Sequence, residues 1–142
     1  MSDDEVFVKR FAKLERILRK LRDVAAATWE EYSNDEGLQD RAERNLQIAA
    51  QICIDIGNHL IAINGFRPPE SYSDIFVVLR EEGIISEDLA VTFRKIAAFR
   101  NVLVHDYIEI DQKLVFDCLQ HLDAFRAFVQ KVTHWLYPPP GE

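Results

Sequence analysis

Three stretches of the chain place apolar residues alternately four and three positions apart, and this spacing constrains the fold more than any other feature. The residues are Phe7, Phe11, Leu14, Leu18, Leu21 and Ala25; Ala42, Leu46, Ala49, Cys53, Ile56, Leu60 and Ile63; and Val115, Cys118, Leu122, Phe125, Val129, Val132 and Leu136. Such spacing places side chains on one face of a helix, which must be covered by other helices. The sequence therefore predicts an all-α protein, an up-and-down four-helix bundle with an extra short helix.

The turn and capping residues predict where the helices begin and end. We expect long helices over residues 3–28, 38–63 and about 87–105, and a last helix capped by Asp111 that continues to residue 136. A short helix is expected at about 73–82, ended by Gly83, and residues 33–37 are expected to form a polar loop. At 142 residues the chain is expected to be a single domain, residues 1–142, with a proline-rich tail from about 137.

Charge and composition restrict the partners and the compartment. The net charge of −7 argues against non-specific coating of nucleic acid, so any contact with RNA must come from a local basic cleft. Basic residues also recur along one face of the first helix, where a solvated face is favoured over RNA contact: Lys9, Lys13, Arg16 and Lys20. The acidic N-terminus lacks a signal-peptide pattern, and no membrane span is expected, which favours a cytoplasmic location. Cys53 and Cys118 are interpreted as small buried hydrophobes rather than a disulfide.

The stretch from Arg100 to Tyr107 carries the residues best suited to chemistry. Leu89, Phe93, Ile96, Arg100 and Leu103 recur four and three positions apart, so Arg100 is expected on the core-facing side of its helix. A guanidinium there implies a buried anion or a polar cavity that admits one. A histidine five residues later adds a group that exchanges protons near neutral pH.

The pattern Arg100-x4-His105-x-Tyr107 resembles the signature of HEPN-domain proteins of the HepT type, toxins paired with a minimal nucleotidyltransferase antitoxin. The resemblance extends over essentially the whole chain, because length and helix order also fit. It implies a HEPN-type bundle that cleaves RNA as a homodimer, with facing motifs in a shared cleft. It further implies that the antitoxin transfers AMP to Tyr107 and so silences the toxin. Asn101 and Asp106 are assigned a supporting role.

An arginine and a histidine suffice in principle to cut RNA without a metal. The 2′-hydroxyl attacks the adjacent phosphorus, a histidine moves the protons, and an arginine stabilises the phosphate oxygens. No cofactor or metal is therefore expected. On an ideal helix, however, Arg100 and His105 lie about 140° apart. Either the helix unwinds near Val104, or the arginine of one chain meets the histidine of another.

Asp55 and His59 lie one turn apart on the same predicted helix face. Two ligands are too few for a metal site, and a hydrogen-bonded structural pair is the favoured interpretation. The functional alternative is that this face lines the cleft under the arginine motif.

Other functions remain open at this point. His105 could cap a helix C-terminus while Arg100 pairs with Asp55 inside the bundle. The chain could be a non-catalytic HEPN scaffold that binds a nucleotidyltransferase or a nucleotide, or a plain helical adaptor. A wide apolar face on the last helix predicts a partner, which we expect to be a second copy of the chain. Its residues are Phe116, Leu119, Phe128 and Trp135.

Overall fold

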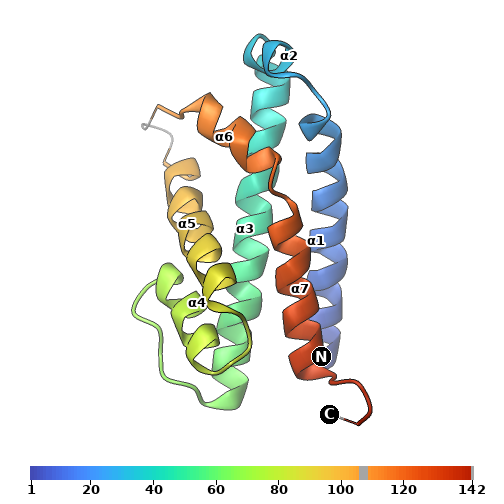
Figure 1. Cartoon of the computed structure of the whole chain (residues 1–142), viewed down its shortest axis with the longest axis vertical. Helices are drawn as coiled ribbons and strands as arrows, with labels where there is room; N and C mark the ends of the chain where they lie inside the picture. Colours follow the sequence, from blue (N-terminus) through green and yellow to red (C-terminus); the bar gives the residue numbers. More distant parts are fainter. Residues whose placement is uncertain (106–108, 142) are drawn as a thin grey trace. The chain divides into compact units, whose positions relative to one another are not determined.

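Seven helices make up the computed structural model, which describes residues 1–105 and 109–141 and contains no strand over those ranges (Figure 1). The helices are α1 (Asp3–Ala25), α2 (Trp29–Ser33), α3 (Glu36–Asn64), α4 (Tyr72–Glu81), α5 (Glu87–Leu103), α6 (Gln112–Leu119) and α7 (Asp123–Leu136). The all-α prediction is confirmed. The predicted helices at 38–63 and 73–82 agree closely with α3 and α4, and the helix that carries the motif ends two residues earlier than expected.

The first expected helix is shorter than predicted, because residues 26–35 hold a second, short helix. Thr28 has an extended backbone and caps α2: its Oγ1 accepts from the Glu31 N–H at 3.1 Å, and its own N–H donates to Glu31 Oε1 at 3.0 Å. This capping box stops α1 from continuing, since an N-cap residue lies outside the helix before it. The polar loop predicted at 33–37 is therefore wrong in extent, because Ser33 ends α2 and Glu36 begins α3.

The single last helix predicted up to residue 136 is two helices. The chain leaves α6 through a tight turn, in which the His121 N–H donates to the Cys118 carbonyl at 3.1 Å. Asp111 caps α6 as expected, with Oδ1 accepting from the N–H groups of Lys113 and Leu114. The α6 and α7 helices pack against different helices. This difference explains why an unbroken apolar repeat in the sequence does not give one unbroken helix.

The chain divides into two compact units. Unit 1 comprises Met1–Ile52 and Phe99–Leu122, and unit 2 comprises Cys53–Ala98 and Asp123–Glu142. Neither unit is one continuous segment, since α3 and α5 each contribute to both. One described helix, α3, is long and apolar enough to cross a membrane by length and composition, but 56% of its most apolar window is buried within the protein.

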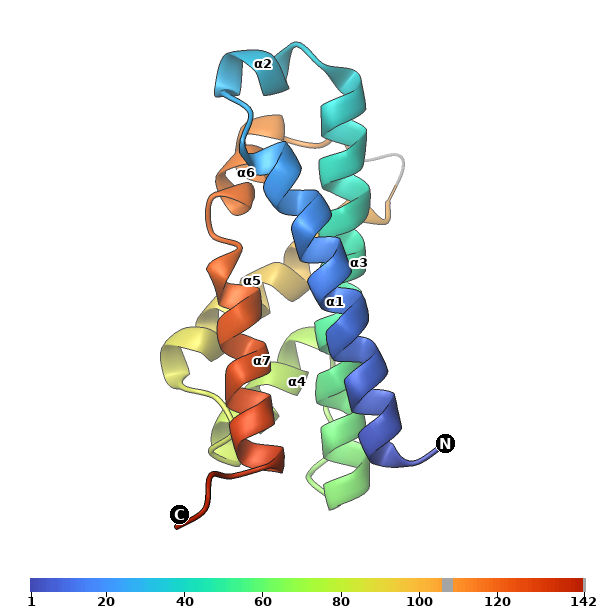
Figure 2. The same ribbon diagram turned by 90° about the vertical axis from the view of Figure 1, so that its right-hand side faces the viewer.

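Unit 1 is built on the apolar face of α1. Its buried side chains keep the predicted rhythm closely: Phe7, Leu14, Ile17, Leu18, Leu21 and Val24. Figures 1 and 2 show α2 joining the end of α1 to the beginning of α3, so that α1 and the first part of α3 run in opposite directions. The α6 helix contacts both α1 and α2. The short α2 contributes Tyr32, which is fully buried and packs against Phe116 of α6 at 5.4 Å between ring centres.

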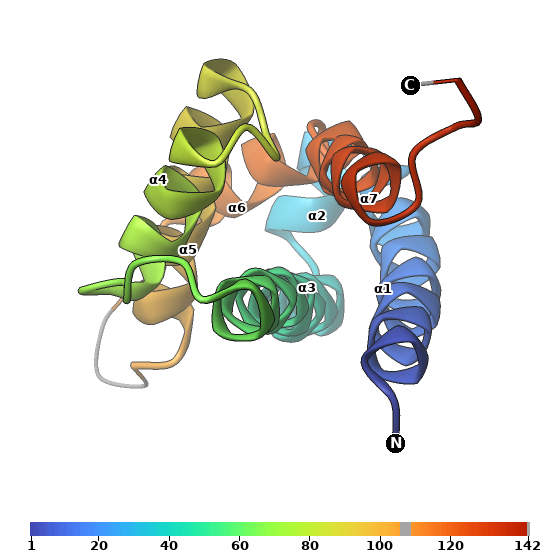
Figure 3. The same cartoon turned by 90° about the horizontal axis from the view of Figure 1, so that it is seen from below.

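Unit 2 is built on four phenylalanine rings. Phe93 of α5 lies 5.1 Å from Phe76 of α4, 5.7 Å from Phe125 and 4.8 Å from Phe128 of α7, measured between ring centres. Figure 3 shows α4 lying along α5, as these contacts require. Aromatic pairs at such separations stabilise a core beyond the area that they bury. The 53–64 part of α3 approaches α4 at Gly57, where an added Cβ would lie 2.6 Å from Ile75 Cγ2.

The wide apolar face expected on the last helix is largely used within the chain itself. Leu119 and Phe128 are buried, and Phe116 packs edge-on against Trp29 at 5.5 Å. Trp135 remains 36% exposed but contacts the ring of Phe66. This face therefore gives little support for a second copy of the chain, and the homodimer stays a prediction.

Candidate functional site at the end of α5

Arg100 and His105 lie on either side of the point at which α5 ends. The helix ends at Leu103, and the next two residues close it: the Val104 N–H donates to the Arg100 carbonyl, and the His105 N–H donates to the Val102 carbonyl, both at 3.2 Å. The second bond spans three residues rather than four, which tightens the last turn. The ideal-helix angle of about 140° therefore does not apply to this pair, because His105 is no longer in the helix.

Arg100 is half-buried, although its helix face differs slightly from the prediction. The most buried side chains of the 87–103 helix are Ala90, Phe93 and Ala97, so the buried stripe is centred one position away from the expected one. The Nε atom of Arg100 is buried, while its Nη1 donates to Asn101 Oδ1 at 3.2 Å. Asn101 itself is exposed. Asn101 thus contacts the arginine, and its supporting role stays a prediction.

His105 is exposed directly after the helix. A proton-transfer group must be reachable by its substrate, and the position of this imidazole meets that requirement. The adjoining Asp106 and Tyr107, which the motif assigns as a supporting residue and as the AMP acceptor, lie outside the described residues. Their roles stay predictions.

Asp55 and His59 belong to unit 2, one turn apart on α3, and both are half-buried. Their part in the site stays a prediction. Near them, burial raises the pKa of the Cys53 thiol, and the charge of Asp55 raises it further. The Cys53 thiol is consequently protonated and a poor nucleophile. Over residues 1–105 and 109–141, no three His, Cys, Asp or Glu side chains come together in a way that could hold a metal ion.

A polar network anchors the chain on the far side of the motif, and sequence reasoning missed it. The Tyr32 hydroxyl donates to Gln112 Oε1 at 2.6 Å, and Gln112 Nε2 donates to Glu43 Oε2 at 2.8 Å. These bonds tie the first residue of α6 to α2 and α3. Burial raises the pKa of Tyr32, and the nearby Glu43 carboxylate raises it further, so this hydroxyl remains a donor.

Thr28-x-x-Glu31 is a readable capping-box signature and could have predicted α2. No local pattern could have paired Tyr32 with Gln112, which lie 80 residues apart.

The family model and two of the related proteins that this chain resembles carry the name HepT. The family model described as Ribonuclease HepT-like matches residues 14–132. An mRNA nuclease HepT from Shewanella oneidensis is 28% identical over 130 residues, covering 91% of this chain and 97% of that protein. A tRNA nuclease HepT from Aphanizomenon flos-aquae is 27% identical over 130 residues, covering 89% of this chain and 87% of that protein.

A solved structure extends the comparison to three dimensions. It is of a tri-AMPylated Shewanella oneidensis HEPN toxin in complex with an MNT antitoxin. The match has a TM-score of 0.84 and 29% identity, and covers 94% of this chain and 98% of that one. The chain therefore has the fold of that HEPN toxin, as its sequence predicts.

Proposed function

Because the chain belongs to the Ribonuclease HepT-like family, we propose that it is an endoribonuclease toxin of a toxin–antitoxin system. The observation that carries the proposal is the end of α5, where a half-buried Arg100 precedes an exposed His105. Both residues fall within the matched residues 14–132. Two relatives that share most of their length with this chain are named as nucleases of mRNA and of tRNA.

In the proposed reaction, the 2′-oxygen of a ribose forms a bond to the adjacent phosphorus, and the bond from phosphorus to the 5′-oxygen breaks. His105 takes the proton from the 2′-hydroxyl or delivers one to the leaving 5′-oxygen. Arg100 stabilises the negative charge that builds on the phosphate oxygens, for which a planar guanidinium is well suited. The chemistry requires no metal, and its products end in a 2′,3′-cyclic phosphate.

We further propose that the working site is shared by two chains, with Arg100 of one chain facing His105 of the other. Support comes from the local geometry rather than from apolar surface: the arginine is half-buried within its own helix, whereas the histidine is exposed beyond the helix end. A two-fold dimer would bring each exposed histidine to the partner's arginine and create two equivalent composite sites.

Metal independence is tested with purified protein and RNA in EDTA. We expect cleavage with cyclic-phosphate ends, and a loss of about 10²–10⁴-fold in rate for His105→Ala, the usual cost of removing a proton-transfer group. Helical circular dichroism should be unchanged, because His105 lies outside the helices. Activity that appears only with added magnesium would contradict the metal-free route. Full activity of His105→Ala would remove the histidine from the mechanism.

The shared site is tested by combining two inactive variants. Arg100→Ala and His105→Ala are co-expressed with different tags, and the mixed dimer is isolated through both tags. In a shared site, the mixed dimer keeps one intact arginine–histidine pair out of two, so about half of the wild-type rate should return. If each chain uses its own pair, the mixed dimer stays as inactive as its parents. A monomer mass from light scattering would exclude the arrangement outright.

We propose that Tyr107 accepts AMP from a cognate minimal nucleotidyltransferase. A relative of the same fold is described as tri-AMPylated and in complex with such an antitoxin. An added phosphate near Arg100 would compete with RNA for the guanidinium. Intact-mass spectrometry after incubation with antitoxin, ATP and magnesium should show AMP on the wild type and none on Tyr107→Phe, which should still cut RNA. AMP on the Tyr107→Phe protein would make another residue the acceptor.

A further inference from the structure

The α1 helix concentrates positive charge on a protein that is otherwise acidic. Of the 17 Lys and Arg residues in the chain, seven lie between positions 9 and 22, together with only one of the 24 Asp and Glu residues. The chain as a whole has a net charge of −7. A local excess of this kind is the electrostatic pattern that marks a surface for a polyanion.

Five of these cations form one face of the helix, here called the α1 basic stripe: Lys9, Lys13, Arg16, Arg19 and Lys20. All five side chains are exposed. Lys9, Lys13, Arg16 and Lys20 recur at spacings of four, three and four, which places them within about 60° around the helix axis and along about 16 Å of its length. Arg19 lies at the edge of the same face. The stripe is thus a straight row of charge, long enough for several consecutive phosphates.

The charge of the stripe is not neutralised by the protein. The one carboxylate in this stretch, Glu15, is bound by Arg22 at 3.0 Å. Within the part of the chain that the structure describes, none of the five stripe side chains forms a hydrogen bond, an ion pair or a ring contact. Like charges three and four residues apart destabilise a helix. On an ordinary solvent-exposed helix face, Asp and Glu residues lie between the Lys and Arg residues. The α1 basic stripe has no such carboxylates.

We propose that the α1 basic stripe binds the phosphate backbone of the RNA substrate, which rests on the ribonuclease function proposed above. The stripe carries no aromatic or amide side chain that could stack on or read a base. Lysine and arginine contacts to phosphate position a nucleic acid without selecting its sequence. Binding should therefore depend steeply on salt and little on sequence. The sequence alone favours a solvated face here, and the exposed, unneutralised row reverses that interpretation.

The probe is short labelled single-stranded RNA with methylated 2′-oxygens, which lacks the attacking hydroxyl and cannot be cut. Binding to the full-length protein is followed by fluorescence anisotropy over a range of KCl concentrations. In Lys9→Gln/Lys13→Gln/Lys20→Gln, the slope of log affinity against log salt should fall by about 2, because each single-strand phosphate contact contributes about 0.7. Affinity should fall equally for uridine-rich and adenine-rich probes. Glutamine and lysine have similar helix propensities, so α1 should remain folded.

A matched control removes the same net charge elsewhere. Arg44→Gln/Lys95→Gln/Lys131→Gln replaces three exposed cations on α3, α5 and α7. This control should keep the wild-type salt slope. Equal changes in both triple variants, or none in either, would overturn the assignment of the stripe. So would a stripe variant that binds RNA normally but no longer binds the antitoxin, since an acidic protein would then be the ligand.

The same experiment separates this inference from the proposed activity. If wild-type protein binds the probe through the stripe but cleaves no unmodified RNA in EDTA, the stripe assignment holds and the ribonuclease proposal fails. If wild-type protein cleaves RNA and the stripe variant has an unchanged KM, the enzyme stands and the stripe is not its RNA surface.

Discussion

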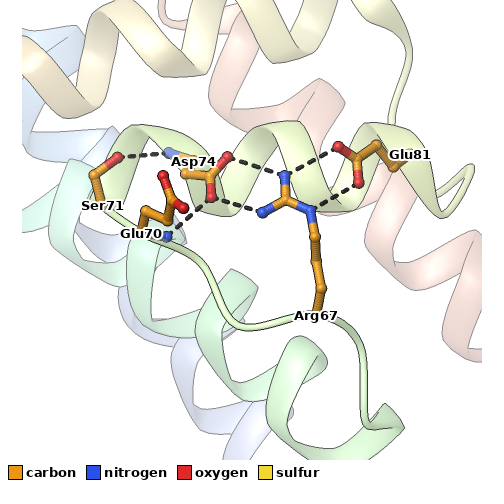
Figure 4. Close-up of polar contacts among 5 residues, drawn as sticks. All are labelled: Arg67, Glu70, Ser71, Asp74 and Glu81. Atoms are coloured by element: carbon orange, nitrogen blue, oxygen red, sulfur yellow. Dashed lines mark hydrogen bonds and ion pairs between the residues drawn. The ribbon is translucent and has the colours of Figure 1, made fainter.

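A single side chain, Arg67, fixes the connection between α3 and α4. Its guanidinium bonds to both oxygens of Asp74, at 2.8 and 3.0 Å, and to both oxygens of Glu81, each at 3.0 Å (Figure 4). Asp74 also accepts from the Glu70 N–H at 2.9 Å. The arginine and the Glu70 N–H together lower the pKa of Asp74 to about 2. Two prolines make this connection unable to form a helix, and the arginine supplies the bonds that hold it.

Because of the Arg67 contacts, we expect the free energy of unfolding to depend on pH in the acid range. A carboxylate whose pKa is lowered by folding stabilises the folded state above its unfolded pKa, near 3.8, and loses that effect as the pH falls toward about 2. In urea unfolding, Arg67→Gln should therefore be less stable than wild type at pH 6. The difference between the two midpoints should shrink as the pH falls from about 4 to about 2.

Lys131→Gln serves as the control for this titration, because Lys131 is an exposed cation outside the Arg67 cluster. Its difference from wild type should not change over the same pH interval. A difference for Arg67→Gln that stays constant down to pH 2 would show that the arginine does not act through these carboxylates.

At the scale of single helices, the close approach of α3 to α4 depends on Gly57. Replacing a helical glycine by alanine ordinarily gains about 1 kcal/mol. Here the new Cβ would lie 2.6 Å from Ile75 Cγ2 and 3.3 Å from Leu79 Cδ1, in a buried contact. Overpacking of a core costs about 1–3 kcal/mol. We expect Gly57→Ala to lower the free energy of unfolding by about 1 kcal/mol net, measured by urea denaturation.

A double-mutant cycle identifies the cause. Ile75→Ala alone creates a cavity and destabilises, but in the Gly57→Ala background it also removes the clash. The double variant should therefore cost less than the sum of the two single variants. Additive costs, or a Gly57→Ala protein more stable than wild type, would show that the helices separate without strain.

The helices that could be predicted are those whose signals are local. The apolar residues spaced four and three positions apart predicted α1. The end of α3 at Asn64–Gly65 was predicted because a glycine can adopt the positive φ, here 65°, that ends a helix. The break after Leu119 could not be predicted, because no glycine or proline marks it. It reflects which rings each part contacts, Phe116 with α2 and Phe125 with α5. Those contacts are set by the tertiary structure.

The candidate site was predictable to the same extent. The position of Arg100 and His105 at a helix end follows from the sequence, and so does the capping of α6 by Asp111. Unwinding near Val104 was one of two alternatives that the sequence left open, and the helix does end before Val104. The Tyr32–Gln112 bond could not be predicted, because no local pattern links residues 80 positions apart.

At the scale of the whole molecule, the two tryptophans report on different units. Trp29 belongs to unit 1 and packs on Phe116, and Trp135 belongs to unit 2 and packs on Phe66. We propose that residues 1–142 unfold as one domain, since α3 and α5 each supply residues to both units. In urea, the variants Trp135→Phe and Trp29→Phe each keep one tryptophan. In each variant, the unfolding midpoint measured by fluorescence should equal the midpoint measured by circular dichroism. Separate midpoints would mean two independent domains.

The interleaving of the two units also has a consequence for synthesis on the ribosome. Unit 1 needs the segment 99–122 and unit 2 needs α7, so neither core can be completed while only the first two-thirds of the chain has emerged. At about 5–20 residues per second, a nascent chain spends seconds with the apolar face of α1 and the motif helix made but not yet covered. Until those segments have emerged, the uncovered apolar faces are surfaces of the kind that chaperones and proteases recognise.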